Sequence, residues 1–190
     1  MRVITGTAKG HRLKAPRGLT TRPMLDRVKE SLFSTLTSQY TLHGRILDLY
    51  AGTGSLGIEC LSRGATGADF VEQNAHVCHI IRENLAHTGF RDQGHVHCMP
   101  VARYLQRRAS TACYDFIFMD PPYADPAIEQ TIRTITTIGM RTDQGVLIVG
   151  HSPRVVLADT YGEWQRIKAR RVGDSCFSIY EHTDGIRSTV

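Results

Sequence analysis

The sequence contains, at positions 46–57, the run Ile46-Leu47-Asp48-Leu49-Tyr50-Ala51-Gly52-Thr53-Gly54-Ser55-Leu56-Gly57. A short apolar segment ends in closely spaced glycines and continues into a helical pattern over residues 55–63. A strand, a glycine-rich turn and a helix in this order are typical of the first unit of a doubly wound α/β sheet. In such sheets, ligands bind beyond the carboxyl ends of the strands.

Four more apolar runs follow the first one, and helical patterns separate them. The runs cover residues 67–72, 95–99, 114–119 and 145–149. Asn74 is placed to cap the helix after the second run, and Asp125 with Pro126 is typical of a helix start. Alternating strands and helices predict a doubly wound, mostly parallel sheet that is buried on both faces.

The last part of the chain has a different pattern. Residues 164–172 and 176–182 are predicted to form an antiparallel hairpin around Gly173-Asp174, which brings the expected sheet to seven strands. Arg166, Lys168 and Arg170 alternate along the first of these strands, so we expect them to share one face of an edge strand.

The chain begins with a basic segment. Residues 1–30 hold eight Lys and Arg against two acidic residues, a net charge of +6, whereas the other 160 residues hold 15 basic and 16 acidic side chains. We interpret residues 1–25 as a small basic hairpin or arm and residues 26–190 as a single domain, in which a helix begins at Asp26. The charge indicates a polyanionic partner, and a solubility tail is the alternative.

The composition indicates in which cellular compartment the protein is expected. Five cysteines are scattered without a Cys-x-x-Cys pair, which predicts neither a disulfide framework nor a metal site. No apolar run approaches the ~20 residues of a membrane span, and the first residues lack the apolar core of a secretory signal. We therefore expect a cytoplasmic protein that does not bind membranes.

The glycine loop carries two acidic candidates. Gly52, Gly54 and Gly57 match Gly-x-Gly-x-x-Gly, which by itself does not separate a dinucleotide from S-adenosylmethionine. A carboxylate at Asp48 would repel a pyrophosphate but could accept from the ammonium of a methionine moiety. Glu72 ends the second strand, where it can hold ribose hydroxyls. Both also have structural interpretations, as a cap of the loop N–H groups and as a surface residue.

The segment Asp120-Pro121-Pro122-Tyr123 follows the most apolar strand. Two consecutive prolines stop the strand pairing and leave carbonyl acceptors with few competing donors. The Asp120 carboxylate and the Pro121 carbonyl could each accept one N–H of an exocyclic amine and direct its lone pair toward a methyl sulfonium. Tyr123 offers a flat face to a base taken out of its stack. Whether Asp120 takes the proton stays open, and a structural turn is the alternative.

With these segments identified, the chain resembles the RsmD family, the bacterial 16S rRNA guanine-N2 methyltransferases. Four segments carry the resemblance: Arg22–Phe33, Ile46–Ala65, Phe116–Tyr123 and Gly173–Tyr180. The resemblance implies a Rossmann-like class I methyltransferase domain and S-adenosyl-L-methionine as methyl donor. It also implies transfer to N2 of a guanine in small-subunit rRNA, either free or in the assembling subunit.

The resemblance also implies roles for individual residues. The catalytic residues would be Asp120, Pro121, Pro122 and Tyr123. The cofactor would contact Asp48, Ala51, Gly52, Gly54 and Glu72, and the RNA would contact Arg12, Arg22, Asp26 and Arg27. No metal is implied, and we expect a monomer. Pro100 stands about where the family usually carries an acid that contacts adenine, so residues 98–102 are given no side-chain role. Met24-Leu25 stand where the family usually has small hydroxyl residues, which leaves the local RNA contacts open.

Three other functions remain open. The glycine loop with Glu72 permits a nicotinamide-dependent oxidoreductase, which the Asp120–Tyr123 loop and the short C-terminal part oppose. An N6-adenine methyltransferase acting on RNA or DNA would use the same acceptors. An RNA-binding module derived from a methyltransferase would not need the complete set of site residues.

Overall fold

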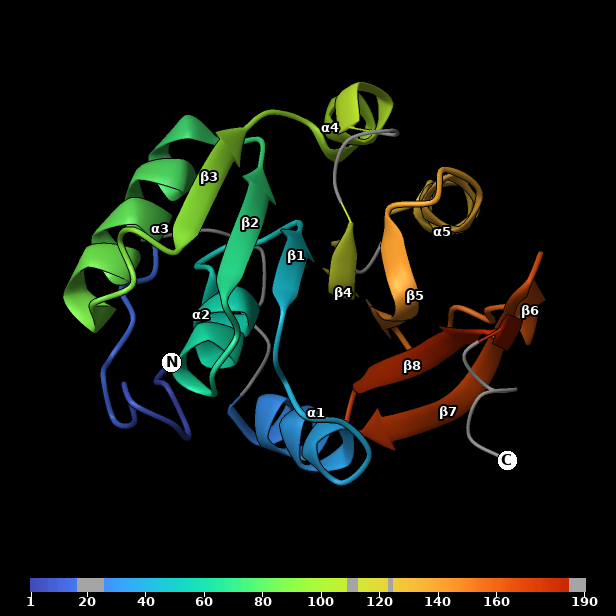
Figure 1. The fold of residues 1–190 in the computed structure, drawn as a ribbon, viewed down its shortest axis with the longest axis horizontal. Coiled ribbons are helices and arrows are strands. Elements are labelled where there is room, and N and C mark those ends of the chain that lie inside the picture. The colour runs from blue at the N-terminus through green and yellow to red at the C-terminus, as the bar shows by residue number, and fades with distance from the viewer. Residues whose placement is uncertain (17–25, 109–112, 123–124, 185–190) are drawn as a thin grey trace.

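The computed structural model describes residues 1–16, 26–108, 113–122 and 125–184, and its strands form one sheet. The first five strands are β1 (Arg45–Leu49), β2 (Gly67–Glu72), β3 (Gly94–Cys98), β4 (Tyr114–Met119) and β5 (Arg141–His151). They are followed by β6 (Thr160–Tyr161), β7 (Trp164–Val172) and β8 (Ser175–His182). The spatial order is β3-β2-β1-β4-β5-β8-β7-β6 (Figure 1).

Strands β1 to β5 pair in parallel, and the C-terminal strands join β5 in antiparallel pairs. The predicted mostly parallel sheet with a C-terminal hairpin is confirmed. The predicted number of seven strands is wrong, because the described residues form eight. The additional strand is β6, which pairs Tyr161 with Trp164. Its two residues are too few to produce an alternating pattern in the sequence.

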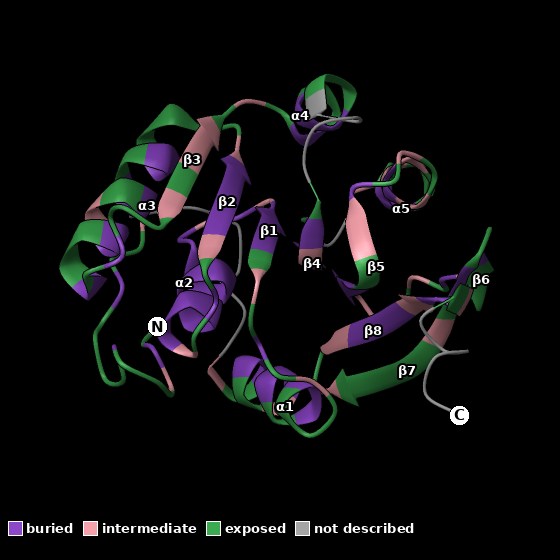
Figure 2. Cartoon of the chain, viewed as in Figure 1, coloured by how far each residue is buried: buried purple, intermediate pink, exposed green. Residues whose placement is uncertain are grey.

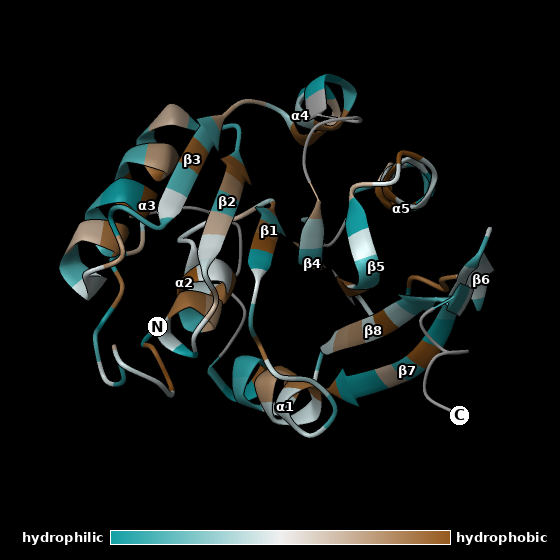
Figure 3. Cartoon of the chain, in the orientation of Figure 1, coloured by the Kyte–Doolittle hydropathy of each residue, from teal (hydrophilic) through white to brown (hydrophobic). Residues whose placement is uncertain are grey.

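Helices cover both faces of the sheet (Figure 1). One face carries α1 (Asp26–Thr37), α2 (Ser55–Ser62) and α3 (Ala75–Thr88), and the other carries α4 (Val101–Arg108) and α5 (Ile128–Thr137). The helices turn their buried sides toward the strands in Figure 2, and hydrophilic and hydrophobic bands alternate around α1 and α3 in Figure 3. This two-sided burial is the arrangement that the apolar strands require.

Two predicted helix starts have different outcomes. The Asn74 side chain accepts hydrogen bonds from the N–H groups of His76 and Val77, so the predicted cap of α3 is confirmed. Helix α5 begins at Ile128, so the predicted start at Asp125 and Pro126 is wrong. The Asp125 carboxylate accepts instead from the N–H of residue 127 at 2.9 Å and stabilises a turn ahead of the helix.

A bulge divides β7, the strand drawn mostly exposed in Figure 2. Arg166 lies opposite Tyr180, whereas Lys168 lies opposite Ile179, and the register shifts between the two pairs. Consecutive residues of β8 point to opposite faces, so their partners Arg166 and Lys168 also lie on opposite faces. The prediction that Arg166 shares a face with Lys168 is therefore wrong, although Lys168 and Arg170 do share one.

The described part of the predicted arm, residues 1–16, packs against the domain. Val3, Ala8 and Leu13 are buried in the same core cluster as the inner sides of α2 and α3. The segment forms a bridge between Arg2 and Arg12, which fits a small hairpin. The interpretation of these residues as an arm outside the core is not confirmed, and residues 17–25 lie outside the described residues.

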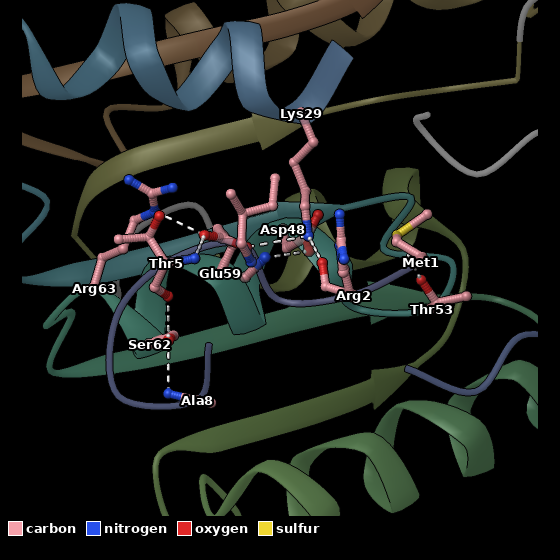
Figure 4. A network of polar contacts seen from close by, with 12 residues as sticks. Met1, Arg2, Thr5, Ala8, Lys29, Asp48, Thr53, Glu59, Ser62 and Arg63 are labelled. Atoms are coloured by element: carbon pink, nitrogen blue, oxygen red, sulfur yellow. Dashed lines mark hydrogen bonds and ion pairs between the residues drawn. The ribbon is translucent and has the colours of Figure 1, made fainter. Parts of the chain in front are cut away.

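Glu59 on α2 holds this segment in place (Figure 4). Its carboxylate accepts the N–H groups of Ile4 and Thr5 at 2.8 and 3.0 Å. The Lys29 ammonium on α1 lies 3.1 Å from the same carboxylate, and both side chains are 0% exposed. Lys29 also donates to the carbonyl of Arg2 at 2.6 Å, and Arg63 donates to Glu59 at 2.9 Å. One buried carboxylate thus joins α1, α2 and the N-terminal segment.

Replacing this carboxylate should destabilise the protein strongly. In Glu59→Gln the Lys29 ammonium remains buried without a counter-charge, a change that typically costs about 3–5 kcal/mol of unfolding free energy. Urea unfolding of the variant and of the wild type measures this difference. The control is Glu83→Gln, which removes the exposed partner of Lys14 and should leave the urea midpoint unchanged. Equal midpoints for Glu59→Gln and the control would contradict the anchoring role.

Candidate active site

A cavity of about 1340 Å³ lies at the carboxyl ends of β1, β2, β4 and β5. Strand β1 lies between β2 and β4, so the strand order reverses its direction at β1. The cavity lies at this topological switch point of the sheet. Its walls bring together most of the predicted site residues: Asp48, Ala51, Gly52, Glu72, Asp120, Pro121 and Pro122.

The backbone of the glycine loop turns sharply. Tyr50, Gly52 and Gly54 have φ values of 58°, 54° and 76°, in the left-handed region. For Tyr50 this conformation is strained, and such strain is concentrated at functional sites. Gly57 has a packing role, since a Cβ there would lie 2.4 Å from Cε1 of Phe70. Gly54 shapes the turn without lining the cavity.

Asp48 caps the glycine loop and also lines the cavity. Its Oδ2 accepts the N–H of Gly57 at 2.9 Å. The side chain is 1% exposed, and no cationic side chain among the described residues pairs with it. Burial raises the pKa of Asp48 to about 8, and the nearby Asp120 and Glu72 carboxylates raise it further against the opposing Gly57 hydrogen bond. A cationic ligand would stabilise its ionised form.

Glu72 ties the end of β2 to the glycine loop. One carboxylate oxygen accepts the N–H of Gly52 at 3.2 Å, and the other accepts the N–H of Asn74 at 2.8 Å. The side chain is half-buried and lines the cavity. Its position fits the predicted role toward hydroxyl groups of a ligand. Apolar residues complete this part of the wall, among them Leu56, Val71, Val77 and Val101.

Asn84 on α3 connects the glycine loop to the N-terminal segment. Its Nδ2 donates to the carbonyls of Thr53 and Lys14 at 2.9 and 3.1 Å, and its Oδ1 accepts the N–H of Lys14 at 2.8 Å. This clamp brings Ala15 and Pro16 into the cavity wall. Sequence reasoning missed Asn84, although a polar residue on the buried helix face was a usable signal.

Asp120 follows β4 and lines the cavity. Burial raises the pKa of its carboxyl group to about 6, so it is mostly ionised at neutral pH. A Cβ at Gly150 of β5 would lie only 2.2 Å from Oδ1 of Asp120. The carboxylate therefore occupies space that only glycine leaves free. Sequence reasoning missed Gly150, because the predicted fifth strand ended at Val149.

The two prolines after Asp120 differ in exposure. Pro121 is buried and Pro122 is exposed. The Pro122 carbonyl accepts the N–H of Asp125 at 2.9 Å. Among the described residues, no hydrogen bond uses the carbonyl of Pro121, which fits its predicted role as an acceptor. Tyr123 lies outside the described residues.

The predicted RNA contacts that the structure describes do not line the cavity. Arg12 and Arg27 are exposed, Asp26 is half-buried at the start of α1, and none of the three lines the cavity. Arg22 lies outside the described residues. These four assignments stay predictions. Across the described chain, His, Cys, Asp and Glu form no group of three or more that could hold a metal, and no helix is long and apolar enough to cross a membrane.

Known proteins resemble the chain over nearly its whole length. Residues 1–181 match the family model described as "Conserved hypothetical protein 95". YlbH of Bacillus subtilis, described as a candidate rRNA methyltransferase, is 34% identical over 95% of this chain and 98% of its own length. Ribosomal RNA small subunit methyltransferase D of Escherichia coli is 28% identical over 95% and 89%. The solved Escherichia coli structure of yhhF, described as a candidate methyltransferase, superposes with a TM-score of 0.82 at 29% identity and covers 96% and 97%.

The buried carboxylate of Asp48 should make stability depend on pH. Its pKa of about 8 in the folded chain lies above the ~3.9 of an unfolded aspartate. Between these values the folded chain retains a proton that the unfolded chain has lost, so stability falls as pH rises. Asp48→Asn keeps an acceptor for Gly57 and should lack this loss.

Urea unfolding at pH 5 and pH 8 measures this effect. The stability advantage of Asp48→Asn over the wild type should grow by more than about 1 kcal/mol between the two pH values. The same pH dependence in both proteins would contradict the raised pKa.

Proposed function

This chain belongs to the RsmD family, whose family model matches residues 1–181. On this premise we propose that it methylates small-subunit rRNA. The methyl donor is S-adenosyl-L-methionine, and the acceptor is the exocyclic N2 amino group of a guanine. The observation that carries the proposal is a single cavity that joins the buried Asp48 carboxylate, beside the glycine loop, to Asp120 and Pro121.

The donor half of the cavity fits S-adenosyl-L-methionine, which when bound supplies a methyl group on a positively charged sulfur. Asp48 would accept from the ammonium of the methionine moiety, and Glu72 from ribose hydroxyls. An ionised Asp48 beside the glycine loop would repel a pyrophosphate, whereas Glu72 could hold ribose hydroxyls of either cofactor, so it is Asp48 that disfavours the nicotinamide-dependent oxidoreductase. The names of the relatives, which describe methyltransferases, support the same donor.

The acceptor half of the cavity suits an amino group with two N–H bonds. The Asp120 carboxylate accepts one of them, and the Pro121 carbonyl accepts the other. These two bonds hold the nitrogen and direct its lone pair toward the donor half. The contribution of the protein is then mostly positioning and electrostatics. Asp120, with a pKa of about 6, is ionised at neutral pH and can also receive the proton that the nitrogen loses.

The choice of guanine N2 over adenine N6 rests on the family resemblance, since the same acceptors serve either amino group. The RNA class is supported by relatives that are named rRNA methyltransferases. In this proposal the protein acts as a monomer in the cytoplasm, on 16S rRNA or on the assembling small subunit.

Asp120→Ala should reduce methyl transfer at least ~100-fold, because the amino group loses its charged acceptor. Binding of S-adenosylhomocysteine should stay within a few-fold of wild type. The assay uses labelled methyl donor with free 16S rRNA and with small-subunit particles from a methylation-deficient strain, followed by nucleoside analysis. The matched control is Asp115→Ala at the opposite end of β4, which should keep transfer. Near-normal turnover of Asp120→Ala would refute the mechanism.

Gly150→Ala should lower kcat with little change in the affinity for S-adenosylhomocysteine. The added methyl group would displace the Asp120 carboxylate, which lies 2.2 Å from the new Cβ position. Single-turnover methyl transfer and calorimetric titration measure the two effects separately. The control is Gly67→Ala in β2, where the nearest atom to the new Cβ is 3.5 Å away. Equal transfer rates in the two variants would show that Gly150 does not position Asp120.

A further inference from the structure

Two arginines line the part of the cavity wall that residues 152–174 contribute. Arg154 follows β5, and Arg171 lies near the end of β7. Both residues are exposed. Among the described residues, no hydrogen bond or ion pair engages the Arg154 guanidinium. The Arg171 guanidinium donates from Nε to the carbonyl of Gly173 at 2.9 Å, and its Nη groups have no described partner. Asp174 is the acidic residue in this part of the wall.

The strand register places Arg171 close to the catalytic carboxylate. His151 of β5 lies opposite Cys176 of β8, and Cys176 lies opposite Arg171 of β7. These three residues form one row across adjacent strands, so the backbone of Arg171 lies about 10 Å from that of His151. The neighbour of His151 in the chain is Gly150, which lies against Asp120.

A second, more open hollow of about 380 Å³, here called the groove, adjoins the cavity at Arg171. The two hollows share Val155 and Arg171 in their walls. Arg166 also lines the groove, but its guanidinium is paired with Asp159 and with the carbonyl of Leu157. Arg154 and Arg171 therefore stand where the cavity opens to the groove, with donors left for a ligand.

We propose that Arg154 and Arg171 bind backbone phosphates of the RNA strand on either side of the target nucleotide. This inference rests on the proposed function. A base that is extruded into the cavity brings its own phosphates to the cavity mouth. Guanidinium groups with unsatisfied N–H donors bind phosphate oxygens strongly and in defined geometry. Arg12 and Arg27, the described arginines that the sequence assigned to RNA, do not line this mouth.

The test compares the double variant R154Q/R171Q with K168Q in the full chain. Lys168 is exposed on the same strand as Arg171, lies on the opposite face because the two residues are three apart in unbroken register, and lines neither hollow. The probe is an unmethylated 16S rRNA transcript, and its Kd is measured between 50 and 300 mM KCl.

Each lost phosphate contact should reduce the slope of log Kd against log salt by ~0.7, which corresponds to ~4-fold weaker binding at 0.15 M salt. The double variant should therefore bind ~15-fold more weakly, with a slope lower by ~1.4. K168Q should bind as the wild type does. S-adenosylhomocysteine should bind all three proteins equally, which verifies that the variants are folded.

Several outcomes would overturn the inference. An unchanged slope and Kd in the double variant would refute it while leaving the proposed function intact, provided that the wild type methylates the RNA. If K168Q weakened RNA binding as much as the double variant does, the arginines would contribute only general electrostatic attraction and not a local phosphate contact. A loss seen with assembled small-subunit particles but not with the transcript would assign the arginines to a ribosomal protein. Absence of methyl transfer to rRNA by the wild type would refute the proposed function and this inference with it.

Discussion

The arrangement of the N-terminal half depends on the ion pairs and hydrogen bonds of the buried Glu59 carboxylate. Four donors reach it, from the backbone of Ile4 and Thr5 and from the side chains of Lys29 and Arg63. Burying this charge is favourable only while these partners are in place. The carboxylate, together with Ser62 on the same helix, therefore holds residues 1–8 in place. The Asn84 clamp then holds the following part of the segment at the cavity.

The central part of the fold was predictable because its signals are local. Each parallel strand is an apolar run bounded by polar or glycine residues, and Asn74 marks its helix through a side-chain cap. The errors arose where the signal was short or shared. Strand β6 has two residues, and Asp125 forms a turn with the same chemistry that starts a helix. The bulge after Arg166 left no mark in the charge pattern and reversed the faces of the residues that follow.

The residues of the candidate site likewise separate into those that the sequence predicted and those that it did not. Asp48, Glu72 and Asp120 were found because each lies at or next to the carboxyl end of a recognisable strand. Gly150 and Arg171 could not be found from the sequence, since their importance comes from strand pairing between distant segments. The charge of the first 30 residues suggested an external arm, whereas backbone N–H groups, which have no sequence signature, attach the described part to α2.

The raised pKa of Asp48 also affects how ligands exchange in the cavity. A positively charged group that binds beside this carboxylate favours its ionised form, so binding near neutral pH expels a proton to the solvent. A ligand that leaves after losing part of its positive charge holds the ionised carboxylate less firmly, and the proton returns. Turnover of such a ligand would then be coupled to a proton cycle between protein and buffer, separate from any proton released by the chemistry. In buffers of different ionisation enthalpy, that cycle contributes differently to the heat of binding.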